Sequence, residues 1–243
     1  MPNTLCLDFG NTRLKWAVFS DGEIRHAGLF QNDGLEDLRQ CIETYKPDKS
    51  ILSSVVNHPD ALEELLKSKT RFHKLNHQSR VPVTTPVGKP ETIGADRLAL
   101  VVAASNLYPD KNNLVIGLGS AITYNYINRF HQFIGGSISP GMEMRFKSLQ
   151  VFTAKLPLVT PHWNFPLLGY DTKTNIQSGV IFGMAKEIDG VIEAYEERVD
   201  NLHVLMSGGD AQYFKPFLKK KITEDPDLIF KGLYVISEFN LSK

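Results

Sequence analysis

The sequence predicts an α/β protein built from two duplicated units that share a central cleft. Its 243 residues, 42% hydrophobic and 22% charged, are enough for one large domain or two modest ones. Strand and helix patterns alternate along the chain. In addition, residues 5–12 (LCLDFGNT) align without a gap on residues 114–121 (LVIGLGSA), and two further strand patterns follow each copy. The predicted boundary lies near residue 112, which gives domains 1–112 and 113–243.

The first half begins with three predicted strands, at residues 4–8, 13–19 and 24–29. In the second of them Leu14, Trp16 and Val18 recur with period two, and Asp21-Gly22 is typical of the hairpin turn that follows. The next predicted elements are a helix at 34–45, a strand at 50–56, a helix at 59–68 and a short strand at 71–75. A proline-rich loop is expected at 76–93, before a helix at 94–107.

The second half repeats this order after the glycine turn. Its predicted elements are strands at 122–127 and 132–138, a helix at 141–152, a long helix at about 173–199 and a strand at 202–206. Prolines make residues 157–166 irregular. The last strand leads into the glycine turn SGGD at 207–210, where backbone can closely approach a flat ring, although this signal is weak alone.

Composition limits the partners of the protein. Basic and acidic residues balance at 27 each and the pI is about 7.1, which argues against binding to nucleic acid or to an anionic membrane. No apolar run approaches the ~20 residues that cross a bilayer, and the first residues do not read as a secretory signal. A cytoplasmic location is therefore expected. Cys6 and Cys41 have no metal-ligand spacing and are expected to be buried, reduced thiols.

The stretch DFGNTR at residues 8–13 could hold phosphate and a metal ion. Asp8 ends a strand and could bind Mg²⁺ through water, because that ion prefers oxygen ligands and keeps most of its hydration. Turn amides, with Asn11 and Thr12, could donate hydrogen bonds to phosphate oxygens, and Arg13 and Lys15 add positive charge. From this motif alone, a capped hairpin turn is the more common outcome.

Two further motifs favour phosphoryl transfer. If the repeats face one another, the turn at 117–121 could hold a polyphosphate from the other side, and such transfer depends mainly on positioning and charge neutralisation. In GADR at 94–97, Asp96 could accept a proton from a hydroxyl, or simply complement a helix N-terminus. Arg97 could pair with a substrate carboxylate, or form a surface ion pair.

These motifs, taken in order, resemble the type III pantothenate kinases. The segments that carry the resemblance are DFGNT at 8–12, GADR at 94–97, GSAIT at 119–123, GGSISPG at 135–141 and DTKTNIQSG at 171–179. They span nearly the whole chain. The resemblance implies two ribonuclease-H-like domains of the actin and sugar-kinase superfamily, with a central interdomain cleft.

The resemblance also implies an activity, which is ATP-dependent phosphorylation of pantothenate to 4'-phosphopantothenate, the first step of coenzyme A biosynthesis. Asp96 would be the catalytic base. The residues that would contact ATP are Asp8, Phe9, Gly10, Asn11, Thr12, Arg13, Leu14, Lys15, Gly119 and Ser120. The residues that would contact pantothenate are Gly94, Ala95, Asp96 and Arg97, together with Thr172 from the partner subunit of a homodimer. The family uses Mg²⁺, here expected at Asp8, and a monovalent cation, K⁺ or NH₄⁺.

Three departures from the family pattern bear on activity. Gly117 and Asn125 stand where aspartates are usual, and the usual tyrosine before GADR is absent near Val87 and Gly88. Loss of the carboxylate at position 117 should weaken binding of the monovalent cation. Two alternatives therefore stay open. One is a nucleotide- or pantothenate-binding, or regulatory, homologue with impaired turnover, and the other is a kinase acting on a different small alcohol.

Overall fold

The computed structural model describes residues 3–85 and 89–241 and confirms the duplicated α/β fold. The first sheet has the order β3-β2-β1-β4-β5 and contains β1 (Thr4–Phe9), β2 (Leu14–Ser20), β3 (Glu23–Phe30), β4 (Lys49–Ser54) and β5 (Arg71–Lys74). The second has the equivalent order β8-β7-β6-β9-β10 and contains β6 (Asn112–Leu118), β7 (Ala121–Ile127), β8 (Phe133–Pro140), β9 (Leu202–Ser207) and β10 (Thr223–Glu224). The same strand order in both sheets bears out the internal repeat.

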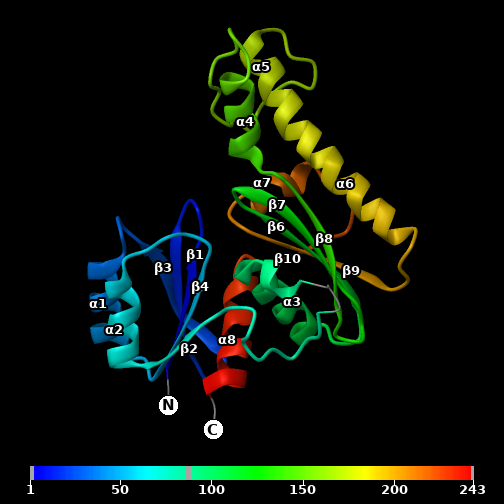
Figure 1. The fold of residues 1–243 in the computed structure, drawn as a ribbon. Helices are drawn as coiled ribbons and strands as arrows, with labels where there is room; N and C mark the ends of the chain where they lie inside the picture. The colour runs from blue at the N-terminus through cyan, green and yellow to red at the C-terminus, as the bar shows by residue number, and fades with distance from the viewer. Residues whose placement is uncertain (1–2, 86–88, 242–243) are drawn as a thin grey trace. The chain divides into compact units, whose positions relative to one another are not determined.

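The helices connect and cover these sheets (Figure 1). The α-helices are α1 (Leu35–Tyr45), α2 (Asp60–Lys69), α3 (Ala95–Leu107), α4 (Met142–Val151), α5 (Thr172–Gln177), α6 (Gly183–Glu196), α7 (Ala211–Phe214) and α8 (Leu228–Leu241). Short helical turns are η1 (Pro90–Thr92), the π-helical η2 (Ser178–Phe182) and η3 (Lys215–Phe217). The single helix predicted at 173–199 is thus one helical stretch from α5 to α6 with a π-helical turn inside it.

The strand register follows the predicted alternation of side chains. β1 pairs antiparallel with β2 and parallel with β4. Asp21 and Gly22 both have positive φ values, 54° and 77°, as the predicted hairpin turn between β2 and β3 requires. Strand β9 likewise lies parallel to both β6 and β10. The two-residue strand β10 was not predicted from the sequence.

The two repeats differ at the turn after the first strand. In the first repeat β1 ends at Phe9 and β2 begins at Leu14, so residues 10–13 form the turn. In the second, β6 ends at Leu118 and β7 begins at Ala121, so the turn consists of Gly119 and Ser120 alone. The gapless alignment predicted from the sequence therefore holds as far as the turn, and the second turn is shorter.

Each face of the first sheet is covered by helices from distant parts of the chain. Leu7 of β1 and Leu52 of β4 belong to the core beneath α1 and α2. The opposite face packs against α8, which also lies along α3 (Figure 1). A Cβ atom on Gly232 of α8 would stand 1.9 Å from the carbonyl oxygen of Ala99 in α3, so this close approach needs glycine.

Contacts along the chain define two compact units. The first comprises residues 1–109, 127–134 and 227–243, and the second comprises 110–126 and 135–226. The first unit therefore includes α8 and residues 127–134, which follow the predicted boundary at residue 112. No helix was predicted over residues 228–241, and the place of α8 depends on its packing against α3 and the first sheet.

Cys6 and Cys41 are buried and free, as predicted, and burial raises the pKa of the Cys41 thiol to about 12. Among the helices of residues 3–85 and 89–241, none combines the length and the apolar character that a membrane span needs.

Candidate functional site

Asp8 is a buried carboxylate at the end of β1. It pairs across the sheet with Lys15 of β2 and Ser53 of β4, and it is only 7% exposed. Burial raises its pKa to about 6, the Lys15 ammonium 4.0 Å away lowers it, and the nearby Asp96 carboxylate raises it again. The charge on Asp8 is therefore maintained at a cost in free energy, which points to a role in binding.

The start of α3 places Asp96 near Asp8. Gly94 precedes the helix, and a Cβ atom there would stand 2.5 Å from Oδ1 of Asp96, so the carboxylate folds back over a residue without a side chain. Arg97 is half-buried with its guanidinium 5.7 Å from the centre of the Phe133 ring. Burial lowers the pKa of Arg97, and Asp96 opposes this shift. The GADR motif thus presents one carboxylate and one guanidinium in the first turn of α3.

The first glycine turn offers backbone and polar side chains to solvent. The Gly10 N–H donates to the carbonyl oxygen of Arg13 at 3.1 Å, and Asn11, Thr12 and Arg13 are exposed. The flanking side chains face inward, because Phe9 is buried in the core and Leu14 packs against that core. Of the residues predicted to contact ATP, Phe9 therefore leaves only backbone atoms for a ligand, and the side chain of Leu14 is half-buried.

A polar network behind β1 supports this turn, and sequence reasoning missed it. The Val55 N–H donates to the carbonyl oxygen of Phe9 at 3.0 Å, and the His58 ring meets the Phe9 ring edge-on at 5.7 Å. His58 Nε2 lies 3.1 Å from Oε1 of Glu63. Burial raises the pKa of Glu63, but hydrogen bonds from Lys74 and His58 outweigh burial and lower it to about 2. An ionised Glu63 thus anchors the ring that packs on Phe9.

The second glycine turn is enclosed by backbone from other segments of its own unit. The Gly119 N–H donates to the carbonyl oxygen of Ala121, and the Gly141 N–H donates to that of Ser120, both at 3.1 Å. A Cβ atom on Gly141 would stand 2.3 Å from the carbonyl oxygen of Gly119. On Gly208, which has a φ of 116°, it would stand 2.0 Å from that of Leu118. The GGSISPG and SGGD segments, separate in the sequence, therefore both pack on this turn.

A second missed network holds the segment before Gly141. Arg145 Nε donates to the carbonyl oxygen of Pro140 at 2.8 Å, and its guanidinium also forms an ion pair with Glu187 of α6. The Tyr124 hydroxyl of β7 donates to Oε1 of Glu187 at 3.1 Å. No motif in the sequence marks these residues as a group, because they come from three different elements.

The two positions where the family usually has aspartate lie in the second sheet. Gly117 pairs with Ser207 of β9. Asn125 is fully buried, and its amide donates to the carbonyl oxygen of Val115 at 3.2 Å and to Oγ1 of Thr123 at 3.1 Å. In the described part of the chain, no three His, Cys, Asp or Glu side chains gather where they could hold a metal ion.

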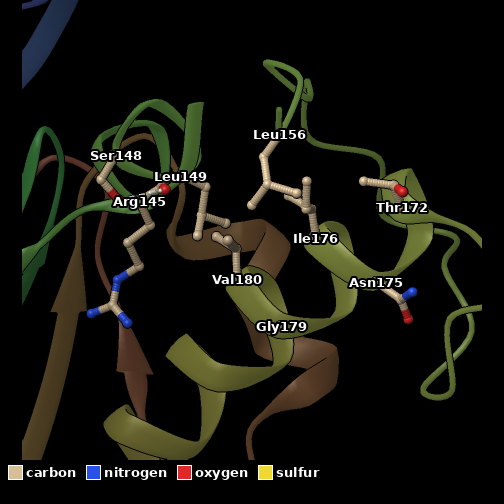
Figure 2. A pocket seen from close by; sticks show the side chains of 9 residues that line it. All are labelled: Arg145, Ser148, Leu149, Leu156, Thr172, Asn175, Ile176, Gly179 and Val180. Atoms are coloured by element: carbon tan, nitrogen blue, oxygen red, sulfur yellow. Dashed lines mark hydrogen bonds between the residues drawn. The ribbon is translucent and has the colours of Figure 1, made fainter. Parts of the chain in front are cut away.

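Thr172 lines an open groove of about 570 Å³ in the second unit. Figure 2 shows apolar side chains in the middle of this groove, with Arg145 at one end and Thr172 and Asn175 at the other. Thr172 is the first residue of α5, and its neighbour Asp171 caps that helix by accepting from the Thr174 N–H at 2.7 Å. The capped helix fixes the position of Thr172 at the rim of the groove.

The structure thus gathers part of the predicted site in each unit. Asp8, Lys15, Asp96 and Arg97 come together in the first unit. The residues of the second unit are Gly117, Gly119, Ser120 and Thr172. Val87 and Gly88, where the family tyrosine was expected, lie outside the described residues.

The two sheets of equal strand order, each with a glycine turn after its first strand, define the class of the protein as a duplicated α/β fold. Similar folds occur in a protein of Sinorhizobium meliloti described as a 2-dehydro-3-deoxygalactonokinase (TM-score 0.60, 11% identity, 99% and 97% of the two chains) and in a conserved Baf family protein of Campylobacter jejuni (TM-score 0.59, 23% identity, 96% of each). At these identities the likeness concerns the fold alone.

Sequence comparison identifies the family. The model of the type III pantothenate kinase family matches residues 4–194. A type III pantothenate kinase of Christiangramia forsetii is 39% identical over 240 residues, which cover 97% of this chain and 98% of that protein. The chain belongs to the type III pantothenate kinase family, which implies ATP, a divalent metal ion and a small-molecule substrate.

Proposed function

We propose that this protein transfers the terminal phosphoryl group of ATP to the primary hydroxyl of pantothenate, with Asp96 as the general base. The observation that carries the proposal is the pair of carboxylates in the first unit, where Asp96 begins α3 close enough to the buried Asp8 to raise its pKa. Asp96 would accept the hydroxyl proton as the hydroxyl oxygen bonds to phosphorus. ADP leaves with the electrons of the broken bond.

The residues around Asp8 fit a hydrated divalent cation. Asp8 would hold the ion through water, since Mg²⁺ binds proteins through one or two carboxylates and keeps several waters. When bound there, the ion supplies positive charge against the phosphate oxygens. Lys15, 4.0 Å from Asp8, adds charge to the same place, and the backbone of residues 10–13 would receive phosphate oxygens from ATP.

Arg97 is the proposed partner of the pantothenate carboxylate. Its contact with the Phe133 ring fixes the plane of the guanidinium, which suits a bidentate pair with a planar carboxylate. Gly94 and Ala95 would contribute backbone to the same substrate, beside the base on Asp96. In the second unit, Gly119 and Ser120 would contact ATP through the turn that Gly141 and Gly208 enclose.

The monovalent-cation site is proposed to be altered in this chain. Gly117 provides no carboxylate. Asn125 carries no charge, and its amide donates hydrogen bonds within the sheet. Binding of K⁺ or NH₄⁺ should therefore be weaker than in relatives with aspartate at these positions. The absence of carboxylates at positions 117 and 125 also supports a second candidate function, a homologue that binds nucleotide and pantothenate with impaired turnover.

We also propose that the protein is a cytoplasmic homodimer in which Thr172 contacts pantothenate bound to the partner. Large apolar side chains of the second unit are highly exposed, with Phe152, Leu168 and Tyr170 at 84%, 85% and 81%. Apolar groups of this size are usually covered in the working protein. Sedimentation of the purified protein, compared with a Phe152→Glu variant, tests for the dimer.

Complementation tests the role of Thr172 across the interface. Asp96→Asn and Thr172→Ala variants, each with little activity alone, would be mixed after reversible dissociation. About half of the dimers would then be mixed and one of their two sites intact, so about a quarter of wild-type activity should return. If Thr172 acted on its own subunit, mixing would restore nothing.

The decisive experiment measures ADP and phosphopantothenate formed by the purified protein with ATP, Mg²⁺ and pantothenate, with and without K⁺. Stoichiometric formation of both products is expected. Calorimetric binding of ATP and pantothenate without turnover would instead establish the impaired homologue. ADP release with another small alcohol in place of pantothenate would establish a kinase of different specificity.

A further inference from the structure

Ser53 carries a buried hydroxyl that the fold does not use. Its side chain is 0% exposed, and in the described part of the chain its Oγ is a buried side-chain atom with no hydrogen-bond partner. Buried hydroxyls in native proteins are nearly always hydrogen-bonded, because an unpaired one loses its water without replacement. An isolated exception therefore suggests a partner that binds later.

The strand register shows where this hydroxyl lies. Ser53 of β4 is the parallel neighbour of Asp8 of β1, and paired residues of neighbouring strands share one face of the sheet about 4.8 Å apart. Leu52 and Leu7, one residue earlier on each strand, occupy the other face in the core under α1 and α2. The Ser53 hydroxyl and the Asp8 carboxylate are thus neighbours on the face that α3 and α8 pack against.

We propose that Ser53 is a positioning residue for the divalent cation of the kinase reaction. Its hydroxyl would form a hydrogen bond with a water molecule in the hydration shell of the ion held at Asp8. This inference rests on the proposed kinase function. It uses the ability of a hydroxyl both to donate and to accept, which fixed carboxylates lack.

The chemistry of the ion favours this arrangement. Mg²⁺ demands a near-octahedral shell and gives up its waters reluctantly, so the protein must order waters as well as supply a ligand. Partners one step outside the ligands fix the orientation of such a shell and change metal affinity when removed. Lys15, on the other side of Asp8, is a cation and cannot accept a hydrogen bond from a water, whereas Ser53 can.

A matched pair of serine variants tests the proposal. Ser53→Ala removes the unpaired hydroxyl, and Ser50→Ala removes a hydroxyl on the same strand that is hydrogen-bonded to Thr70. Mn²⁺ affinity would be measured by electron paramagnetic resonance on the full chain with a saturating non-hydrolysable ATP analogue. We expect Ser53→Ala to weaken Mn²⁺ binding about 3- to 10-fold, the effect of one hydrogen bond, and Ser50→Ala to leave it unchanged.

Thermal melts without metal supply an independent readout. Ser53→Ala should melt at or above the wild-type temperature, because it removes an unsatisfied group. Ser50→Ala should melt lower, because it breaks a bond and leaves Thr70 without that partner. Equal Mn²⁺ affinity in Ser53→Ala and wild type, with nucleotide binding intact, would overturn the role of Ser53 and leave the kinase function standing. Failure of the wild type to bind the analogue at all would overturn both.

Discussion

The two glycine turns occupy equivalent places in the duplicated fold, yet different physical means maintain them. The first turn, residues 10–13, lies beside a buried carboxylate on Asp8 whose pKa is raised to about 6. The second turn has Gly117 at the position equivalent to Asp8 and has no charged residue of its own. Instead, Gly141 and Gly208 bring backbone within contact of it.

This difference separates two tasks that ATP binding requires. In the proposed function, Asp8 beside the first turn would place charge where a divalent cation and phosphate oxygens bind, at a cost in folding free energy. The second turn would provide shape, since the Gly141 N–H donates to the carbonyl oxygen of Ser120 and Arg145 Nε donates to that of Pro140. We therefore expect activity to be most sensitive to changes of charge in the first unit and to changes of side-chain size in the second.

The largest effect is expected for Asp8→Asn. Turnover with Mg²⁺ should fall by at least about 100-fold, because the carboxylate proposed to hold the cation is lost. Without metal, the variant should be more stable than wild type at pH 7 by up to about 3 kcal/mol, from a pKa raised from 3.8 to about 6. Initial rates and denaturant unfolding of each protein measure the two effects.

The pH dependence of this gain has a definite sign. Folded Asp8 binds its proton more tightly than unfolded Asp8, so wild-type stability should decrease as pH rises from about 4 to about 6. The Asp8→Asn variant should lack that decrease, and the two proteins should converge below pH 4. Asp110→Asn, which removes an exposed carboxylate, is the control and should match wild type in rate and stability.

The next largest effect is expected for Gly141→Ala. The added methyl would lie 2.3 and 2.5 Å from the carbonyl oxygens of Gly119 and Ser120, so the second turn must move. Destabilisation of about 1–3 kcal/mol should accompany a rise in the KM for ATP. Gly190→Ala in α6 is the control, because its methyl meets nothing within 4 Å and should stabilise the helix by about 0.5–1 kcal/mol. A Gly141→Ala enzyme with unchanged KM for ATP would contradict the steric role.

A smaller effect is expected when the Arg145 network is broken. Arg145→Met and Glu187→Gln should each raise the KM for ATP about 3-fold, because Pro140 and the turn beyond Gly141 lose their support. In the double variant the losses should not add, and coupling of about 0.6 kcal/mol in nucleotide affinity is expected, which is the free energy of one 3-fold loss. Additive losses in a calorimetric double-mutant cycle would show that the two side chains act separately.

The smallest effect is expected for Gly117→Asp, which restores in the second repeat the kind of charge that Asp8 gives the first. The new carboxylate should strengthen binding of K⁺, so activity should become more dependent on K⁺ than in wild type. A titration of initial rate against KCl, with NaCl and the Gly117→Asn variant as controls, measures the change. Identical K⁺ curves for Gly117→Asp and wild type would argue that position 117 lies away from the cation.

The fold could be predicted from the sequence because its signals are local. Period two in Leu14, Trp16 and Val18 and the turn at Asp21-Gly22 specify the first hairpin, and the repeated strand and turn pattern reveals the duplication. The π-helical turn at Ser178–Phe182 could not be predicted from the sequence. Its five residues are too few to show the change in periodicity that distinguishes π from α hydrogen bonding. The placement of α8 was missed because it depends on long-range packing.

In the candidate site, too, residues within local motifs could be predicted and residues that depend on long-range pairing could not. Asp8, Asp96 and Gly119 could be proposed because each lies in a motif with its own local chemistry. Ser53 was treated only as part of a strand, and its meaning depends on its register with Asp8. Only the parallel pairing of β1 with β4, which joins segments far apart in the sequence, puts Ser53 beside the carboxylate.

The packing of α8 against α3 has a consequence for the order of events during synthesis. The first unit needs residues from both ends of its sequence, and the whole second unit is made between them. The first sheet therefore cannot gain its covering helix until translation has passed residue 241. The second unit can fold earlier from its own segments. A chain that ends before α8 and is joined to the ribosome by a long flexible linker should carry a protease-resistant second unit and a sensitive first one, with Asp8 and Asp96 not yet enclosed.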